Sequence, residues 1–121
     1  MSGENSAVDE VCILHIMNGD HASRAIAVLA VGLLYGLKER VETLEYAESL
    51  IFSPRTVKYM RSRGMDEVLC GLVSDGCELE DYLSLKPDGF DSAIDGLICR
   101  LLKYLKDSPG AIGDVSLRFL Q

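Results

Sequence analysis

Apolar residues follow one another without a charged side chain from Ala25 to Leu37, in the stretch AIAVLAVGLLYGL. Asp20 lies upstream, where it can cap a helix over residues 21–38. Because this helix would be apolar on nearly all sides, we expect other helices to surround it. A membrane span needs about 20 apolar residues to cross the bilayer. The stretch is shorter than that, so we expect no membrane insertion.

The clearest amphipathic pattern lies near the C-terminal end of the chain, where large apolar residues recur at every third or fourth position. This stripe predicts a helix from residue 89 or 90 to residue 105, with one face in the core. Its members are Phe90, Ile94, Leu97, Ile98, Leu101, Leu102 and Leu105.

Capping residues delimit two shorter helices after the first long one. Thr43 is placed to cap a helix over about residues 44–52. Ser53 followed by Pro54 predicts the start of another, because proline is well tolerated at the first helical position. We expect that helix to end at Gly64.

Two more helices are expected before the long C-terminal one. The first begins at Asp66 and ends at Ser74, and a short one follows it and stops before Pro87. We predict that four residues of the first face inward, namely Val68, Leu69, Leu72 and Val73. Leu79, Tyr82 and Leu83 share one face of the second by their helical spacing.

The two ends of the chain are ambiguous. Residues 1–5 have the composition of a loose tail, and a helix is expected over residues 7–17. The apolar residues in 11–17 are too continuous to separate helix from strand, and residues 115–119 alternate like a short strand. Taken together, the patterns predict one all-α domain over residues 1–121, an irregular and mostly antiparallel helical bundle around a central apolar helix.

The net charge of the chain limits the kinds of partner that it can bind. The chain has 12 Lys and Arg against 19 Asp and Glu, a net charge of −7. Such a chain repels phosphate, so we do not expect it to bind nucleic acid.

The chain has four cysteines, Cys12, Cys70, Cys77 and Cys99, and they form no C-x-x-C pair. With a polar and acidic start to the chain, they are expected to be buried, reduced thiols of a cytoplasmic protein.

Candidate chemistry is sparse. Cys12, His15 and His21 do not have the spacing of a zinc module. A loop starting at Asp75 lacks the oxygen ligands that a calcium-binding EF-hand requires. No nucleophile with a base and an orienting group stands out. We therefore expect no catalytic residue, metal or cofactor, and a protein that is not an enzyme.

Charges of opposite sign are segregated in the middle of the chain. Residues 55–63 carry four basic residues and no acid, and residues 66–81 carry six acids and no base. Two accounts fit. The two segments can simply pair with each other, or the acidic one can be a contact face for a basic protein. For the second account the candidate partner-binding residues are Asp75, Glu78, Glu80 and Asp81.

Gly32 and Gly36 are four residues apart and so share one face of the expected apolar helix. Small residues at this spacing let a second helix approach closely. That helix can belong to the same chain, or it can belong to a second copy in a homodimer.

Three short motifs follow in order: GLLYGLKE, EYAESLIFSP and GCELEDYLSL. In this combination, over about residues 25–85, the chain resembles a family of small all-helical bacterial proteins of unknown function. The resemblance implies a small bacterial protein and transfers no catalytic residue. By size and acidity the chain is also similar in kind to immunity proteins, which neutralise a toxin by binding it. The expected function is a non-enzymatic acidic module of immunity or inhibitor type, and a structural or regulatory homodimer is the alternative.

Overall fold

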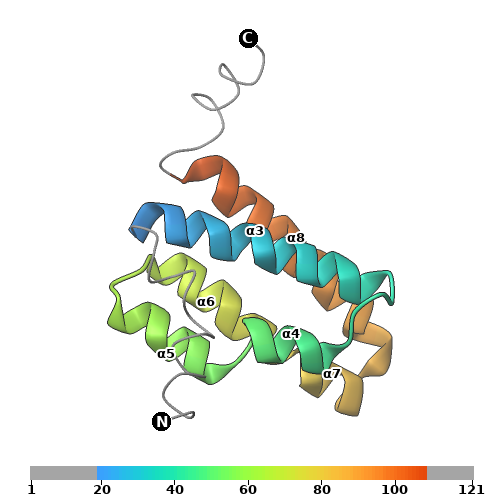
Figure 1. The fold of residues 1–121 in the computed structure, drawn as a ribbon. Coiled ribbons are helices and arrows are strands. Elements are labelled where there is room, and N and C mark those ends of the chain that lie inside the picture. Colours follow the sequence, from blue (N-terminus) through green and yellow to red (C-terminus); the bar gives the residue numbers. More distant parts are fainter. Residues whose placement is uncertain (1–18, 109–121) are drawn as a thin grey trace.

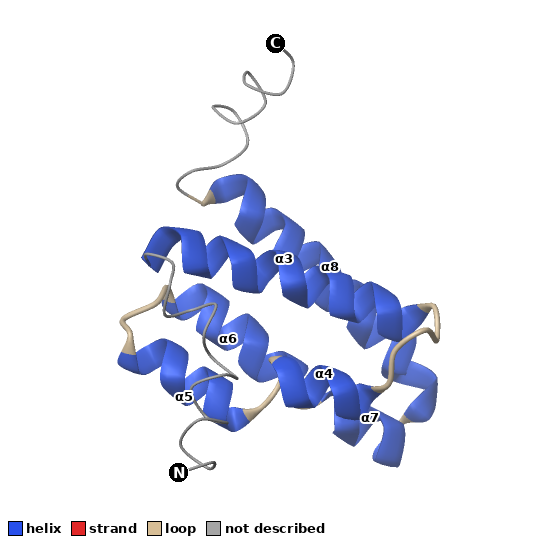
Figure 2. Ribbon diagram, viewed as in Figure 1, coloured by secondary structure: helices blue, strands red, loops and turns tan. Residues whose placement is uncertain are grey.

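The computed structural model describes residues 19–108, and these residues form an all-α arrangement (Figure 1). Within this range every regular element is a helix and there is no strand, as Figure 2 shows. The helices are α3 (Gly19–Lys38), α4 (Leu44–Leu50), α5 (Pro54–Ser62), α6 (Glu67–Gly76), α7 (Leu79–Leu85), the 3-10 turn η1 (Pro87–Gly89) and α8 (Phe90–Asp107). The predicted fold class, a mostly antiparallel helical bundle, is confirmed.

The two longest helices, α3 and α8, lie side by side and run in opposite directions (Figure 1). Near the start of α3, Arg24 Nη1 donates hydrogen bonds to the Leu105 carbonyl oxygen at 3.1 Å and to Ser108 Oγ at 3.0 Å. At the other end of the pair, Lys38 Nζ lies 2.8 Å from Asp95 Oδ1. These contacts fix the register of the pair on which the shorter helices pack.

A single hydrophobic cluster joins all the α-helices. Five residues of the predicted α8 stripe are buried in it: Phe90, Ile94, Leu97, Ile98 and Leu101. Leu102, which was predicted to belong to the stripe, is exposed, because it lies beyond the edge of the face that meets the other helices. Burial of this cluster is the main favourable term in folding of the bundle.

The predicted helix caps at Thr43 and Ser53 are confirmed, and Asp66, predicted as the start of a helix, is a third cap. The side chains of Thr43, Ser53 and Asp66 accept hydrogen bonds from backbone N–H groups in the first turns of α4, α5 and α6. Gly64 has a φ of 70° just after α5, a conformation that glycine adopts at little cost. The cap predicted at Asp20 is wrong, because Asp20 lies within α3 rather than before it.

A left-handed residue ends α3. Arg40 has a φ of 63°, which is uncommon for a residue other than glycine. Its guanidinium donates to the Leu37 carbonyl oxygen at 2.8 Å and to Asp91 Oδ1 at 3.2 Å, and it lies 5.9 Å from the centre of the Phe90 ring. The start of α8 therefore holds this turn in place.

The expectation that helices surround residues 25–37 on nearly all sides is wrong for one face of α3. Val28 is 57% exposed, Tyr35 is 47% exposed, and Leu29 is exposed as well. The opposite face carries the buried residues, including Ala27, Ala30 and Leu34. The shorter helices pack against only one side of the α3–α8 pair, so no helix of residues 19–108 covers the other side of α3.

Several smaller expectations are also wrong. Val68, predicted to face inward, is 62% exposed. It lies in the first turn of α6 and points toward α8, but α8 does not cover it. Of the three residues with helical spacing in α7, Leu79 is buried, whereas Tyr82 and Leu83 are exposed. Cys99 is an exposed thiol rather than a buried one, whereas Cys70 is buried.

Some predictions concern residues outside the described range. These are the helix over residues 7–17, the choice between helix and strand for residues 11–17 and 115–119, and the burial of Cys12. Within the described range, no helix is both long enough and apolar enough to span a bilayer.

Candidate functional site

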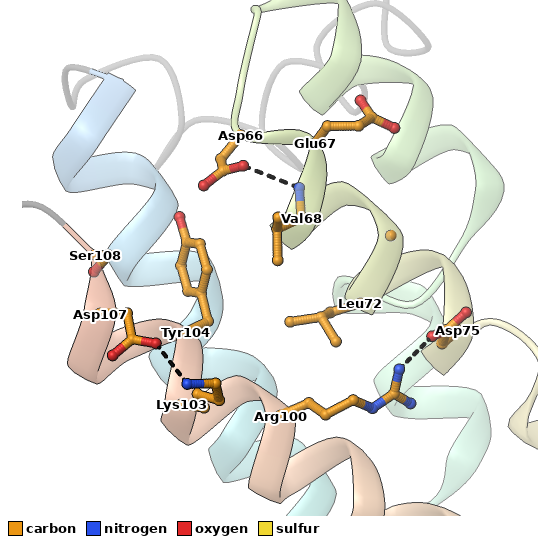
Figure 3. A pocket seen from close by; sticks show the side chains of 11 residues that line it. Asp66, Glu67, Val68, Leu72, Asp75, Arg100, Lys103, Tyr104, Asp107 and Ser108 are labelled. Atoms are coloured by element: carbon orange, nitrogen blue, oxygen red, sulfur yellow. Dashed lines mark hydrogen bonds and ion pairs between the residues drawn. The ribbon is translucent and has the colours of Figure 1, made fainter.

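An open groove of about 620 Å³ lies between α6 and α8 (Figure 3). We call it the α6–α8 groove. Its apolar part consists of Val68 and Leu72 from α6 and the ring of Tyr104 from α8, which face one another across the groove. Charged side chains border this apolar part. The groove therefore offers a hydrophobic surface within a polar rim, a combination typical of binding sites.

The helical spacing of α6 determines which of its side chains line the groove. Asp66 Oδ1 accepts a hydrogen bond from the Val68 backbone N–H at 3.0 Å, which fixes the first turn of the helix. Val68, Leu72 and Asp75 then follow at intervals of four and three residues, so they lie on one face and point toward α8.

The spacing of α8 builds the opposite side in the same way. Arg100, Tyr104 and Asp107 recur at intervals of four and three residues. Arg100 Nη1 reaches across the groove to Asp75 Oδ2 at 2.8 Å, and this ion pair is about half exposed. Lys103 Nζ pairs with Asp107 Oδ2 at 2.9 Å within α8. Only the first of these pairs bridges the two helices.

A second hollow of about 320 Å³ shares Asp75 and Arg100 with the first. It extends to Glu78 and Tyr82 of the α7 region and to Gly96 of α8. The Arg100–Asp75 ion pair thus stands between two parts of a longer channel. Carboxylates outnumber cations in the lining of the two parts, with Asp66, Glu67, Asp75, Glu78 and Asp107 against Arg100 and Lys103.

The four predicted partner-binding residues do not form one surface. Asp75 and Glu78 both line the channel. Glu80 is exposed and lies close enough to Glu48 of α4 for its charge to affect that carboxyl group. Asp81 is exposed and lines neither part of the channel. The structure therefore brings two of the four into the candidate site.

A second acidic group forms where α4 approaches α7. Burial, and then the charges of Glu80 and Glu45, raise the pKa of Glu48. Burial, with the charges of Glu48 and Glu78, raises the pKa of the Cys77 thiol to about 11. Burial also raises the pKa of Cys70. Neither thiol is therefore activated as a nucleophile, because the reactive form is the thiolate.

Comparison with known proteins places the chain in a family. A family model described as "Protein of unknown function (DUF3969)" matches residues 17–115. The chain belongs to this family. A search of curated proteins gives no match, and a search of solved structures gives none either. The DUF3969 match confirms the resemblance to a family of unknown function and extends well beyond residues 25–85 in both directions.

One ion pair in this DUF3969 chain joins the basic segment to the acidic one. Arg61 Nη2 of α5 lies 2.9 Å from Glu67 Oε1 of α6. Arg63 instead donates to the Tyr59 hydroxyl at 2.8 Å, and Asp75 pairs with Arg100 of α8. The account in which the two segments simply pair with each other therefore holds for Arg61 and Glu67, and not for Asp75.

The described part of the chain contains no group of three His, Cys, Asp or Glu side chains that could hold a metal ion. Cys12 and His15, considered above as ligands, lie outside that part. The α6–α8 groove thus combines an apolar centre with paired charges at its border.

Sequence reasoning missed the α8 side of the groove. None of Arg100, Lys103 and Asp107 was among the candidate residues of the sequence, and neither was Glu48 of the second acidic group. One signal was available, because Arg100, Tyr104 and Asp107 recur at intervals of four and three residues and so share one face of the predicted helix.

Proposed function

We propose that this protein is a non-enzymatic binding module whose α6–α8 groove receives a segment of a basic partner protein. The observation that supports this proposal is the pairing of an apolar groove centre with a lining in which carboxylates outnumber cations. A partner segment that fits would present one or two apolar side chains to Val68 and Leu72 and place basic side chains at the rim.

The apolar centre supplies the affinity. Val68 is exposed in the first turn of α6, and the Tyr104 ring faces it from α8. Covering such groups with a partner's apolar side chain removes them from water, which contributes about 25 cal/mol per Å² of apolar surface. Aromatic rings of this kind are frequent anchors in protein interfaces.

The rim supplies the selectivity. The Arg100–Asp75 ion pair is half exposed, and exposed pairs of this kind contribute little to stability. A partner's arginine or lysine can therefore compete with Arg100 for the Asp75 carboxylate. Glu78 lies next to it in the second part of the channel. The surrounding negative charge increases the association rate of a basic partner and disfavours an acidic one.

Glu80 and Asp81 have an indirect role in this proposal. They are exposed near the channel without lining it, so they add to the electrostatic field around it. Substitutions there should lower the association rate and its salt dependence rather than the stability of the bound complex.

The biological setting that we propose is that of an immunity or inhibitor protein of the bacterial cytoplasm. Its support is the small size of the chain and its net charge of −7, which together suit the neutralisation of a basic protein by direct binding. The proposal includes no catalytic residue, metal or cofactor.

Affinity capture with the full chain from a lysate of the native organism tests the proposal, followed by titration of the purified partner. We compare Asp75→Lys with Glu78→Lys against the matched control Glu42→Lys with Asp88→Lys. Both double variants change the net charge equally, and both control residues are exposed outside the channel. We expect the first to weaken binding at least about tenfold and the control to retain it.

Val68→Ser tests the apolar centre separately. It removes the exposed side chain of α6 without changing the charge, so we expect it to accelerate dissociation of the partner. Equal losses in the two charge variants would show a response to net charge alone. Unchanged binding in Val68→Ser and in the groove charge variant would contradict the proposal.

A further inference from the structure

The outward face of α3 is uncharged over most of the helix. Ala25, Val28, Gly32 and Tyr35 follow one another along it, with Leu29 at its side, and no charged residue lies between Arg24 and Lys38. Three of these side chains, those of Val28, Leu29 and Tyr35, are exposed. The solvent side of a surface helix normally carries charged and polar residues. A face of this composition is typical of one that another protein surface covers.

The two glycines of α3 differ in their surroundings. A Cβ on Gly36 would meet the side chain of Glu42 within the same chain, so Gly36 is needed for an internal contact. A Cβ on Gly32 would meet nothing within 4 Å. No contact among the described residues therefore explains a glycine at position 32, and it leaves a shallow notch in the middle of the exposed face.

The neighbouring helix extends the same surface. Leu102 of α8 is exposed. Because Arg24 contacts Leu105 and Lys38 contacts Asp95, the antiparallel register places Leu102 beside the turn of α3 that carries Val28. The apolar surface thus spans two adjacent helices rather than one row of residues.

We propose that a second copy of this chain covers the surface, with the two α3 helices packed antiparallel about a two-fold axis at Gly32. A two-fold axis brings identical patches together, so the pattern must be self-complementary. Here the axis sets the Gly32 notches of the two copies against each other, which allows close approach of the helices. It also sets Tyr35 of one copy against Val28 and Leu29 of the other.

The charges at the two ends of α3 favour this arrangement. Arg24, near the start, donates to a carbonyl oxygen and a hydroxyl, both of which are neutral. Glu39, directly after the end, is exposed and forms no ion pair with another described residue. An antiparallel second copy places Arg24 of each chain near Glu39 of the other. A parallel arrangement would instead set like charges side by side.

Analytical ultracentrifugation of the full chain over a wide concentration range tests the dimer. We expect the mass to double with concentration. Val28→Glu and Gly32→Glu would bury an unpaired carboxylate in the interface and weaken dimerisation by about tenfold or more. Leu85→Glu is the control, because Leu85 is 82% exposed and lies on α7, away from α3. Circular dichroism verifies that each variant is folded.

Disulfide trapping tests the two-fold axis itself. Gly32→Cys should form a covalent dimer under mild oxidation, because the axis brings the two copies of residue 32 together, whereas Leu85→Cys should not exceed the wild type. A chain that stays monomeric at all concentrations overturns the proposal. So does a dimer that Val28→Glu and Gly32→Glu leave intact, or one that Gly32→Cys fails to trap. The outcome is independent of partner binding in the α6–α8 groove.

Discussion

The ring of Phe52 lies directly against the backbone of Gly76 and occupies the space in which a Cβ on residue 76 would stand. Phe52 comes just before the Ser53 cap of α5, is 1% exposed, and is among the largest fully buried side chains. Gly76 is the last residue of α6 and is buried as well. This close approach joins the α4–α5 connection to the end of α6.

Substitution Gly76→Ala should therefore destabilise the protein. The added methyl group would overlap the Phe52 ring, which has no free space to move into because it is enclosed by the core. Overpacking of this kind costs about 1–3 kcal/mol. Urea denaturation followed by circular dichroism measures the change as a lower transition midpoint.

Gly71→Ala is the matched control for this change, because Gly71 lies in the interior of the same helix and a Cβ there would meet nothing within 4 Å. Alanine at such a position should stabilise the helix by about 0.5–1 kcal/mol. If both alanine variants shift the midpoint in the same direction, the contact with Phe52 does not decide the effect at position 76.

Ser53→Ala should cost about 1 kcal/mol of stability, since it removes the side-chain oxygen that caps α5. Ser53 Oγ accepts a hydrogen bond from the Thr56 backbone N–H at 3.3 Å and lies 3.1 Å from Thr56 Oγ1. Ser62→Ala removes an exposed hydroxyl at the other end of the same helix and should change stability by less than about 0.5 kcal/mol. Thermal unfolding of both variants checks the difference, and equal effects would refute the capping role.

Glu48→Gln should stabilise the protein at neutral pH. Burial and the charges of Glu80 and Glu45 raise the pKa of Glu48, so the folded state favours the protonated form. Stability from this group is therefore present at low pH and is lost as the pH rises through the raised pKa. Because Glu48 is partly exposed, we expect a gain of only about 0.5 kcal/mol at pH 7.

The dependence of that gain on pH and salt makes the test specific. Glutamine is neutral throughout, so its advantage over glutamate should disappear as the pH falls below the ordinary glutamate pKa of 4.5, where the wild-type carboxyl is protonated as well. Added salt should reduce the part that comes from Glu80 and Glu45. An advantage that is equal at pH 3 and pH 7 would show that ionisation of Glu48 is not its cause.

Arg24→Met should loosen the last turn of α8. The methionine keeps the apolar stem of the side chain but loses the hydrogen bonds to the Leu105 carbonyl oxygen and Ser108 Oγ. We expect the amides of the last turn to exchange about tenfold faster with solvent, which corresponds to one lost hydrogen bond from a charged donor. Lys103→Met removes an exposed ion pair in the same turn and should have little effect.

The helices were predictable because their signals are local. The caps at Thr43 and Ser53 need only a side chain and the backbone within a few residues, so they were found from the sequence alone. The apolar stripe of α8 was equally clear, because its periodicity extends over several turns. The resemblance to a family of unknown function rested on three short motifs in order, and the family match over residues 17–115 confirms it.

The arrangement of these helices was less predictable, because it depends on residues far apart in the chain. Val28 and Val68 are exposed because the other helices cover the opposite sides of α3 and α6. An apolar run in the sequence does not indicate which side of a helix will be covered. Asp75 was singled out as a charged residue, yet its partner Arg100 is 25 positions later and belongs to another segment of the pattern. The groove between them has no local signature for the same reason.

The left-handed turn at Arg40 has a consequence for the order in which the chain folds. The Arg40 side chain makes one contact nearby in the chain, to the Leu37 carbonyl oxygen. Its other two contacts are to the Phe90 ring and to Asp91, which lies 51 positions later. An isolated segment that ends before α8 lacks the distant contacts, and an arginine in this conformation is then unfavourable by about 1–2 kcal/mol. The nascent end of α3 should therefore fray during synthesis and become fixed only after α8 has emerged and docked.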